Sequence, residues 1–261
     1  MIFGIPVVQG THRVVAVDMR GYNESEKPAG IDSYHMETLV EDLRWAPCRA
    51  LELHPRCLVD GLGADKFTLV AHDWGAAVAW TFAALHPARL DNLIILNMPH
   101  LMALLEQRAK TWEQALKSWY IIFFQCPILP ELSLMAEDMA TFKRLFKQVG
   151  SMVEDEETIE AYKFAFKDFT SWNRPLNYYR MTTTAKCQDF FEANKEKYKI
   201  GVRTLQIFGT ADTALSVGAA QLGMAWLTDA RLELLEGVSH WVMEEQPDKV
   251  NKLMEEFLTT A

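Results

Sequence analysis

The segment Phe67–Ala77 (FTLVAHDWGAA) constrains the fold of this chain more than any other. An apolar run ends in one carboxylate, Asp73, and an apolar helical pattern follows it. Such a pattern predicts a strand, a sharp turn and a helix that together lift one side chain clear of the backbone. Ala71 and Gly75, two residues before and after Asp73, favour a close approach of strand and helix. An aspartate at this turn suits attack at a saturated carbon, which leaves an ester on the protein.

Size and composition favour a folded domain with a sizeable core. The chain has 261 residues, which fits one domain or one core with a large insertion. Apolar residues make up 49% of it, enough for a sizeable core. The net charge is −9 and no basic stripe occurs, so we expect no nucleic-acid partner.

The cysteines and the apolar segments also exclude some classes. Cys48, Cys57, Cys126 and Cys187 form no C-x-x-C pair and no metal-ligand spacing, so we expect reduced thiols and no metal site. The apolar start Met1–Val8 is too short for a signal peptide. No apolar run approaches the roughly 20 residues that span a bilayer. We therefore expect a cytoplasmic protein without a membrane span.

Short apolar runs alternate with helical patterns along the chain. Continuous apolar runs are typical of parallel strands that are covered on both faces. The predicted strands are Arg13–Val17, Phe67–Ala71, Leu93–Leu96, Thr204–Phe208 and Leu232–Leu235. Helices are predicted over Ala77–Leu85 and from about Pro247, with Val250, Leu253, Met254 and Phe257 buried at helical spacing. The order of elements predicts the α/β class.

One gap between the predicted strands is too long for a simple crossover. Residues 100–200 are rich in aromatic and charged residues and predict several helices with no strand. We interpret them as a helical lid, with residues 1–99 and 201–261 forming the two parts of the core. The stretch Ala46–Cys57 interrupts what otherwise resembles one helix, because Pro47 and Pro55 do not suit a helix interior.

Three residues that follow predicted strands could form a nucleophile, an acid and a base. Asp73, Asp212 and His240 each come just after such a strand, where α/β sheets place their ligands. Each alone has an ordinary explanation, a turn or helix cap for an aspartate and a solvated loop for a histidine. Their conjunction, in the chain order of the α/β-hydrolase fold, favours a catalytic triad.

The sequence resembles the epoxide hydrolase branch of the α/β-hydrolase superfamily. Four motifs carry this resemblance, and the third of them, in the lid, is the most specific. They are Val14–Tyr22 (VVAVDMRGY), His72–Gly75 (HDWG), Pro175–Arg180 (PLNYYR) and Ser239–Trp241 (SHW). The resemblance implies an α/β-hydrolase sheet flanked by helices, with an inserted helical lid.

The resemblance also implies roles for further residues. Tyr120 and Tyr179 would donate hydrogen bonds to an epoxide oxygen, with Tyr178 the nearest rival to Tyr179; from spacing alone all are ordinary packed tyrosines. The backbone N–H of Trp74 would stabilise the oxyanion. The implied reaction converts a small apolar epoxide to a vicinal diol without a cofactor. The oligomeric state stays open.

The sequence departs from the family near its start. The family carries a His-Gly-x-Pro turn that supplies a second oxyanion N–H, after a strand that lies between the two predicted strands Arg13–Val17 and Phe67–Ala71. Here Ile5–His12 resembles instead the end of the helix that precedes Arg13–Val17, so we interpret the chain as truncated, with the first strands of the fold missing. That loss would leave neighbouring strands unpaired. Asn23 stands where the family usually has glycine, which matters if that backbone needs a positive φ.

Two alternatives to an epoxide hydrolase stay open. A haloalkane dehalogenase would use the same aspartate, acid and histidine, with the ring N–H of Trp74 holding a halide, and would not need the lid tyrosines. An inactive or poorly folded remnant would follow from the missing strand. A serine esterase is disfavoured, because no G-x-S-x-G occurs and Ser239 adjoins His240.

Overall fold

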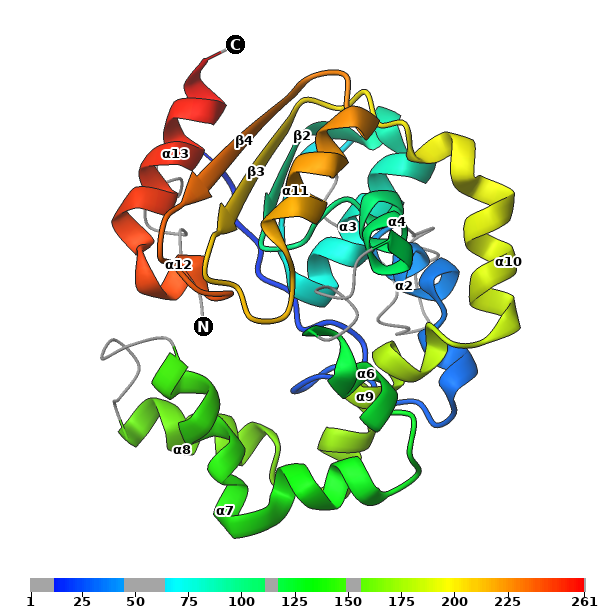
Figure 1. The fold of residues 1–261 in the computed structure, drawn as a ribbon, viewed down its shortest axis with the longest axis vertical. Helices are drawn as coiled ribbons and strands as arrows, with labels where there is room; N and C mark the ends of the chain where they lie inside the picture. The colour runs from blue at the N-terminus through cyan, green and yellow to red at the C-terminus, as the bar shows by residue number, and fades with distance from the viewer. Residues whose placement is uncertain (1–11, 45–63, 111–116, 149–155, 261) are drawn as a thin grey trace.

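A computed structural model describes residues 12–44, 64–110, 117–148 and 156–260. Its sheet is parallel throughout, with strand order β1-β2-β3-β4 (Figure 1). The strands are β1 (Phe67–His72), β2 (Leu90–Leu96), β3 (Thr204–Gly209) and β4 (Ala230–Leu235). Four of the five predicted strands and the α/β class are thus confirmed.

The strands read as continuous apolar runs because both faces of the sheet are covered. Leu93 and Ile95 of β2 belong to one buried cluster, whereas Ile94 and Leu96 belong to another. The second cluster includes the apolar side of α13 (Pro247–Thr259), where Val250, Leu253, Met254 and Phe257 are buried as the sequence predicts.

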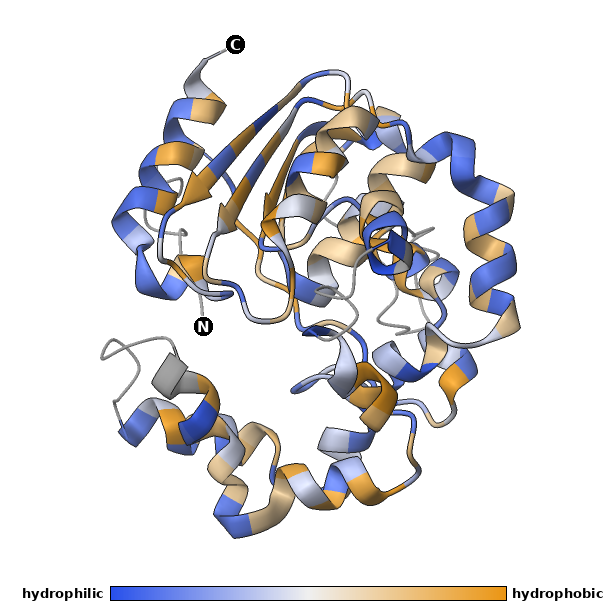
Figure 2. Ribbon diagram, viewed as in Figure 1, coloured by the Kyte–Doolittle hydropathy of each residue, from blue (hydrophilic) through white to orange (hydrophobic). Residues whose placement is uncertain are grey.

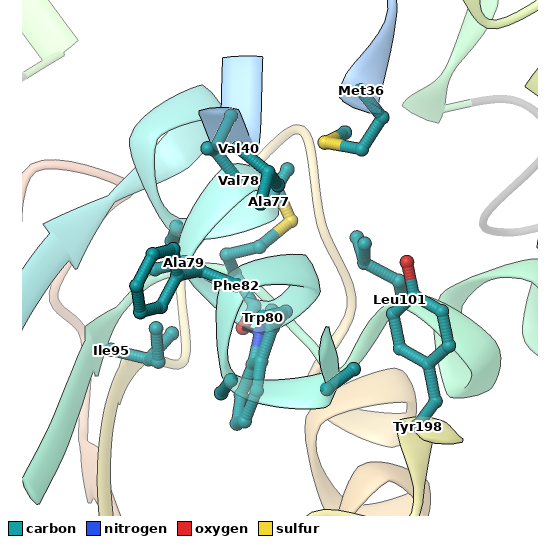
Figure 3. Packing of buried hydrophobic residues seen from close by; sticks show 14 of the residues in the cluster. Met36, Val40, Ala77, Val78, Ala79, Trp80, Phe82, Ile95, Leu101 and Tyr198 are labelled. Atoms are coloured by element: carbon teal, nitrogen blue, oxygen red, sulfur yellow. Dashed lines mark hydrogen bonds between the residues drawn. The ribbon is translucent and has the colours of Figure 1, made fainter. Parts of the chain in front are cut away.

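The helix α3 (Asp73–Leu85) fills the first cluster. It follows β1 directly and packs against β1 and β2. Trp80 and Phe82 are fully buried among Ile95, Leu101 and Tyr198 (Figure 3). The indole N–H of Trp80 donates to the backbone oxygen of Met98, so this large ring is buried without an unpaired donor. α3 is apolar on all sides because it is buried both against the sheet and against the helices that cover it.

The remaining core elements are short connections around the sheet. They are η1 (Ile31–Tyr34), α2 (Met36–Arg44), η3 (Pro87–Arg89), α11 (Val217–Gly223), η6 (Met224–Trp226) and α12 (Val242–Glu245). Asn23 has a φ of +39°, so asparagine adopts the left-handed conformation at the position where glycine was expected.

The prediction of a strand over Arg13–Val17 is wrong. These residues form no strand, and Val15 and Val17 are 42% and 44% exposed. Among the described residues β1 pairs only with β2, so its outer edge has no partner. A strand needs a neighbour for its N–H and C=O groups, and no strand of the described ranges lies between this segment and β1. The predicted irregular stretch Ala46–Cys57 lies outside the described residues.

Between β2 and β3 the described residues are helical and contain no strand, as predicted. The helices of this insertion are α4 (Leu101–Lys110), α6 (Trp119–Phe123), α7 (Leu129–Gln148), α8 (Glu156–Ala165), α9 (Phe169–Met181), α10 (Ala185–Asn194) and η5 (Lys195–Tyr198). α7 is kinked, with non-helical backbone angles from Ala136 to Met139. The proposed boundaries at residues 100 and 200 stay a prediction.

The insertion is attached to the core at both of its ends. α4 packs against α11, and η5 packs against α3. α7 and α8 pack against each other and lie at the bottom of the view in Figure 1, below the sheet. Figure 2 shows mostly polar residues along α10, at the outside of the molecule, and apolar residues along α6. Within the described ranges no helix is long and apolar enough to cross a membrane, and Cys126 and Cys187 are free thiols.

Candidate active site

Asp73 sits at the bend between β1 and α3. His72 still has extended angles (φ −129°, ψ 147°), whereas Asp73 has a φ of +49° before the helix continues. A non-glycine residue in this region is strained, and such strain is typical of functional turns. The side chain of Asp73 is 36% exposed, so the carboxylate can be reached. The expectation that Gly75 relieves crowding is not supported, because an added Cβ would lie 3.5 Å from Met19 Sδ, an ordinary contact.

His240 joins the two predicted carboxylates. Its Nδ1 lies 2.7 Å from Oδ2 of Asp212, and its Nε2 lies 3.1 Å from Oδ1 of Asp73. The three residues follow β4, β3 and β1, whose carboxyl ends lie at one edge of the parallel sheet. Residues 167 positions apart in the chain therefore share one hydrogen-bonded row.

Several N–H groups donate hydrogen bonds to the carboxylate of Asp212. The backbone N–H groups of Ala214 and Leu215 donate to its Oδ1 at 2.7 and 2.9 Å. Burial raises the pKa of this carboxyl, but the hydrogen bonds from His240 and Asn97 more than offset it, so the pKa of Asp212 is lowered. A carboxylate that accepts several N–H bonds stays charged and can orient an imidazole.

The sequence analysis missed Asn97, which follows β2. Its Nδ2 donates to Oδ2 of Asp212 at 2.8 Å and to the backbone oxygen of Ser239 at 3.3 Å. Its Oδ1 accepts from the N–H of Gly209 at 3.2 Å, and its φ is +41°. The signal that could have found it is its position: Asn97 directly follows an apolar strand, as the other site residues do.

Electrostatics favour a doubly paired imidazolium between the two carboxylates. Burial lowers the pKa of His240, but the hydrogen bonds to Asp212 and Asp73 and their charges raise it to about 10. Desolvation raises the pKa of Asp73, but the hydrogen bond with His240 and the nearby histidines lower it overall. The resting site thus holds one cation between two anions.

His72 supports the loop that carries His240. Its Nε2–H donates to the backbone oxygen of His240 at 3.0 Å. Burial and the nearby His240 charge lower the pKa of His72 to about 4, so this ring is neutral at ordinary pH. A neutral ring leaves the charge of the site on His240.

Trp74 lies where an oxyanion donor is expected. Its backbone N–H hydrogen-bonds to the Asp73 carboxylate, at the first turn of α3, where the helix dipole also favours negative charge. Residues 5–11, which belong to the segment interpreted as the end of the helix before Arg13–Val17, lie outside the described residues. In the described ranges no group of three His, Cys, Asp or Glu residues could hold a metal ion.

Tyr120 of α6 and Tyr179 of α9 line one cavity with Asp73 and Trp74. The cavity measures about 540 Å³, and its other lining includes Met36, Met98, Met102, Met181 and Phe191. The two tyrosine rings meet edge to face with centroids 5.8 Å apart. Burial, and next the charge of Asp73, raises the pKa of both phenols, so both hydroxyls keep their protons. Two neutral donors and one carboxylate thus share a chamber whose lining is mostly apolar but also includes Glu106, Arg108, Glu192 and Lys195.

Tyr178, the rival of Tyr179, is engaged elsewhere. It is fully buried, and its hydroxyl donates to the backbone oxygen of Arg20 at 2.7 Å. Its ring packs against Tyr22 and Tyr34. Tyr178 does not line the cavity that holds Asp73, so Tyr179 is the better candidate for a donor to a bound molecule.

A parallel sheet whose strand ends bring Asp73, Asp212 and His240 into one row is the arrangement of α/β hydrolases. Comparisons with known proteins agree. A family model described as the alpha/beta hydrolase fold matches residues 4–247. Epoxide hydrolase 1 of Caenorhabditis elegans is 36% identical over 255 residues, which cover 95% of this chain and 58% of the relative. The AB hydrolase superfamily protein YfhM of Bacillus subtilis is 34% identical, covering 97% of this chain and 82% of the relative.

Solved structures give the same result. The crystal structure of an epoxide hydrolase from Bacillus megaterium in complex with an inhibitor has a TM-score of 0.78 and 26% identity, covering 98% of this chain and 87% of that one. The chain belongs to the alpha/beta hydrolase superfamily, and several of its relatives are named epoxide hydrolases. It spans 58% and 66% of the length of epoxide hydrolases 1 and 2 of Caenorhabditis elegans.

Proposed function

We propose that this protein hydrolyses apolar epoxides to vicinal diols through an ester on Asp73. The observation that carries the proposal is the shared cavity, in which the Asp73 carboxylate faces two protonated phenols, Tyr120 and Tyr179. An epoxide needs a nucleophile at carbon and a donor for its departing oxygen, and the two must act on opposite ends of one bond. The epoxide hydrolase names of its relatives support the same activity.

In the first half-reaction an Asp73 oxygen bonds to an epoxide carbon while the carbon–oxygen bond of the ring breaks. The oxygen that leaves stays attached to the second carbon and takes a proton from a tyrosine hydroxyl. The resting proton of the His240 imidazolium then neutralises the tyrosinate, which leaves His240 able to act as a base. The product is a hydroxyalkyl ester of Asp73. The helical insertion would act as the lid that keeps water from the ring-opening step.

In the second half-reaction His240, oriented by Asp212, takes a proton from water at Nε2. The hydroxide adds to the ester carbonyl, and the backbone N–H of Trp74 stabilises the oxyanion. Collapse of this intermediate breaks the ester bond; the departing alkoxide takes the proton held by His240 and becomes the diol, and the carboxyl proton of Asp73 returns to His240. Asp73 then carries one oxygen atom from water.

Isotope labelling tests this sequence directly. In a single turnover of trans-stilbene oxide in H₂¹⁸O, the heavy oxygen should enter Asp73 and not the diol. Label that enters the diol in the first turnover would mean direct attack by water and would refute the ester. Asp73→Ala should abolish turnover, and retained activity in this variant would also refute the ester on Asp73.

The dehalogenase alternative makes a different prediction. The indole of Trp74, which would hold a halide, contacts the ring of Tyr179 edge to face with centroids 5.0 Å apart. If the double variant Tyr120→Phe, Tyr179→Phe still releases halide from a haloalkane, that result would favour the dehalogenase activity. The remnant alternative predicts a broad thermal transition with dye-accessible apolar surface, whereas a functional enzyme should unfold sharply.

A further inference from the structure

The two cavity tyrosines come from helices that are far apart in the chain, and one of these helices is very short. α6 has only five residues, from Trp119 to Phe123, too few to fix the position of Tyr120 by itself. Tyr179 lies on α9, which is 13 residues long and has an N-cap at Asp168. The geometry of the pair therefore depends on what fastens α6 to α9.

One guanidinium, that of Arg180, provides this link. Its Nε donates to the backbone oxygen of Phe124 at 2.9 Å, and its Nη2 donates to that of Cys126 at 3.0 Å. These carbonyls follow the end of α6, where a cation is also favoured by the helix dipole. Arg180 directly follows Tyr179 in α9. Its side chain therefore links the helix that carries Tyr179 to the turn that follows Tyr120.

A buried carboxylate fixes this guanidinium. Glu131 of α7 is fully buried and pairs with Arg180 through both oxygens, at 2.8 and 3.1 Å. Asn173 of α9 donates a third hydrogen bond to Glu131 at 2.6 Å. Burial raises the pKa of Glu131, but the bonds from Arg180 and Asn173 lower it overall, so this carboxylate stays ionised. A bidentate pair fixes orientation more narrowly than a single contact.

A second contact reinforces the first. The amide of Gln125 donates to the backbone oxygen of Tyr179 at 3.1 Å and to that of Ile121 at 3.0 Å. Its side-chain oxygen accepts from the hydroxyl of Thr183 at 2.9 Å. The same turn is thus joined to the residues on both sides of Arg180, Tyr179 within α9 and Thr183 just after its end.

We propose that Glu131 and Arg180 are positioning residues that set the geometry of the Tyr120–Tyr179 pair. Neither lines the cavity, so they act through the tyrosines and not on the bound molecule. A buried ion pair contributes little net stability on average, whereas it can specify one arrangement. The assignment of this pair to ring opening rests on the proposed function.

The first test needs no activity. The chain has seven tyrosines, and 3-fluorotyrosine gives each a ¹⁹F resonance, with Tyr120 and Tyr179 assigned by their Tyr→Phe variants. Arg180→Lys keeps the positive charge but loses the planar set of N–H donors that binds Glu131 through both of its oxygens. It should shift or broaden the Tyr120 resonance, and Glu131→Gln should do the same. An unmoved Tyr120 resonance in both variants would overturn the inference.

Lys163→Met is the matched control. Lys163 of α8 is as buried as Arg180, with 9% of each side chain exposed, and pairs with Asp138 at 2.5 Å and Glu160 at 2.8 Å. It belongs to the same helical insertion, and its ion pairs are to α7 and α8, not to α6 or α9. Its loss should leave the Tyr120 resonance in place. If Arg180→Lys unfolds the protein, all tyrosine resonances move to the positions of an unfolded chain. The Tyr120 resonance of the milder Glu131→Gln variant then tests the inference.

The second test is a double-mutant cycle on the ring-opening rate. Misplacing a donor should slow ester formation about 100-fold in Arg180→Lys, with ester hydrolysis little changed. In a Tyr120→Phe background the same substitution should cost less than about threefold, because the group it positions is gone. Additive losses would mean a merely structural role. A wild-type protein that opens no epoxide would refute the proposed function but leave the resonance test standing.

Discussion

Nε2 of His240 lies 3.1 Å from Oδ1 of Asp73, so the base and the carboxylate are hydrogen-bonded before any substrate arrives. This contact and the one to Asp212 raise the pKa of His240 to about 10. A protonated imidazole cannot take a proton from water. Ester formation would remove the charge of Asp73 and with it part of the cause of the raised pKa. His240 would thus become a base only after the first half-reaction.

We therefore expect ester hydrolysis, but not ester formation, to slow as the pH falls. Below the lowered pKa of His240 in the ester form, the imidazole stays protonated and water is not activated. Rapid quenching and mass spectrometry should show the fraction of esterified Asp73 at steady state rising toward acid pH. A fraction that is constant with pH would contradict this account.

The same pKa predicts how stability depends on pH. The folded-state pKa of His240, about 10, lies above its ordinary value of 6.5. Its contribution to stability is therefore complete below about pH 6.5 and is lost as the pH rises toward 10. Thermal unfolding across this window should show the wild type losing more stability than His240→Gln. Parallel curves for the two proteins would exclude the contribution.

Asn97 offers a test of the support for Asp212. Asn97→Asp keeps the shape, the left-handed backbone and the acceptor for Gly209, but it places a second carboxylate beside Oδ2 of Asp212. One of the two must then take a proton, and that proton can replace the lost donor only at lower pH. Relative to the wild type, ester hydrolysis should slow about 10- to 100-fold near neutral pH, with the defect growing as the pH rises.

Asn92→Asp is the matched control for this prediction. Asn92 lies at the other end of β2, where its amide donates to Thr68 and accepts from Arg203. The same change of charge there does not touch the triad. Equal defects in Asn97→Asp and Asn92→Asp would show a general effect of the added charge and would remove the special role of Asn97.

The sheet could be predicted from the sequence because its strands are buried on both faces, which leaves unbroken apolar runs such as β2. The row of Asp73, Asp212 and His240 was predictable because parallel strands end at a common edge. Arg13–Val17 shows the limit of this reasoning, since an apolar run becomes a strand only when it has a neighbour to pair with. Asn97 and Glu131 were missed because a single amide or carboxylate has no periodicity, and only the fold shows what it contacts.

The tyrosine pair should matter for ring opening and not for hydrolysis of the ester. Both tyrosines line the cavity beside Asp73, and in the proposed mechanism their hydroxyls donate to the oxygen that leaves carbon. Losing one general acid costs about 100-fold or more in rate, and the two donors share one oxygen. Tyr120→Phe and Tyr179→Phe should therefore each slow ester formation, and the double variant should nearly abolish it. Tyr178→Phe, which loses only its bond to Arg20, should leave the ester-formation rate nearly unchanged.

Among the glycines of the site, Gly209 should tolerate substitution by alanine least. A Cβ built there would lie 2.2 Å from the backbone oxygen of Ser239 and 2.4 Å from that of Val238, so the loop that carries His240 would have to move. Gly209→Ala should destabilise the protein by about 1–3 kcal/mol and reduce ester hydrolysis more than ester formation. Gly201→Ala, whose Cβ would meet only Thr228 Oγ1 at 3.6 Å, is the control and should do neither. Calorimetry and quenched-flow kinetics on both variants separate the two effects, and a Gly209→Ala protein with wild-type hydrolysis would show that the loop tolerates displacement.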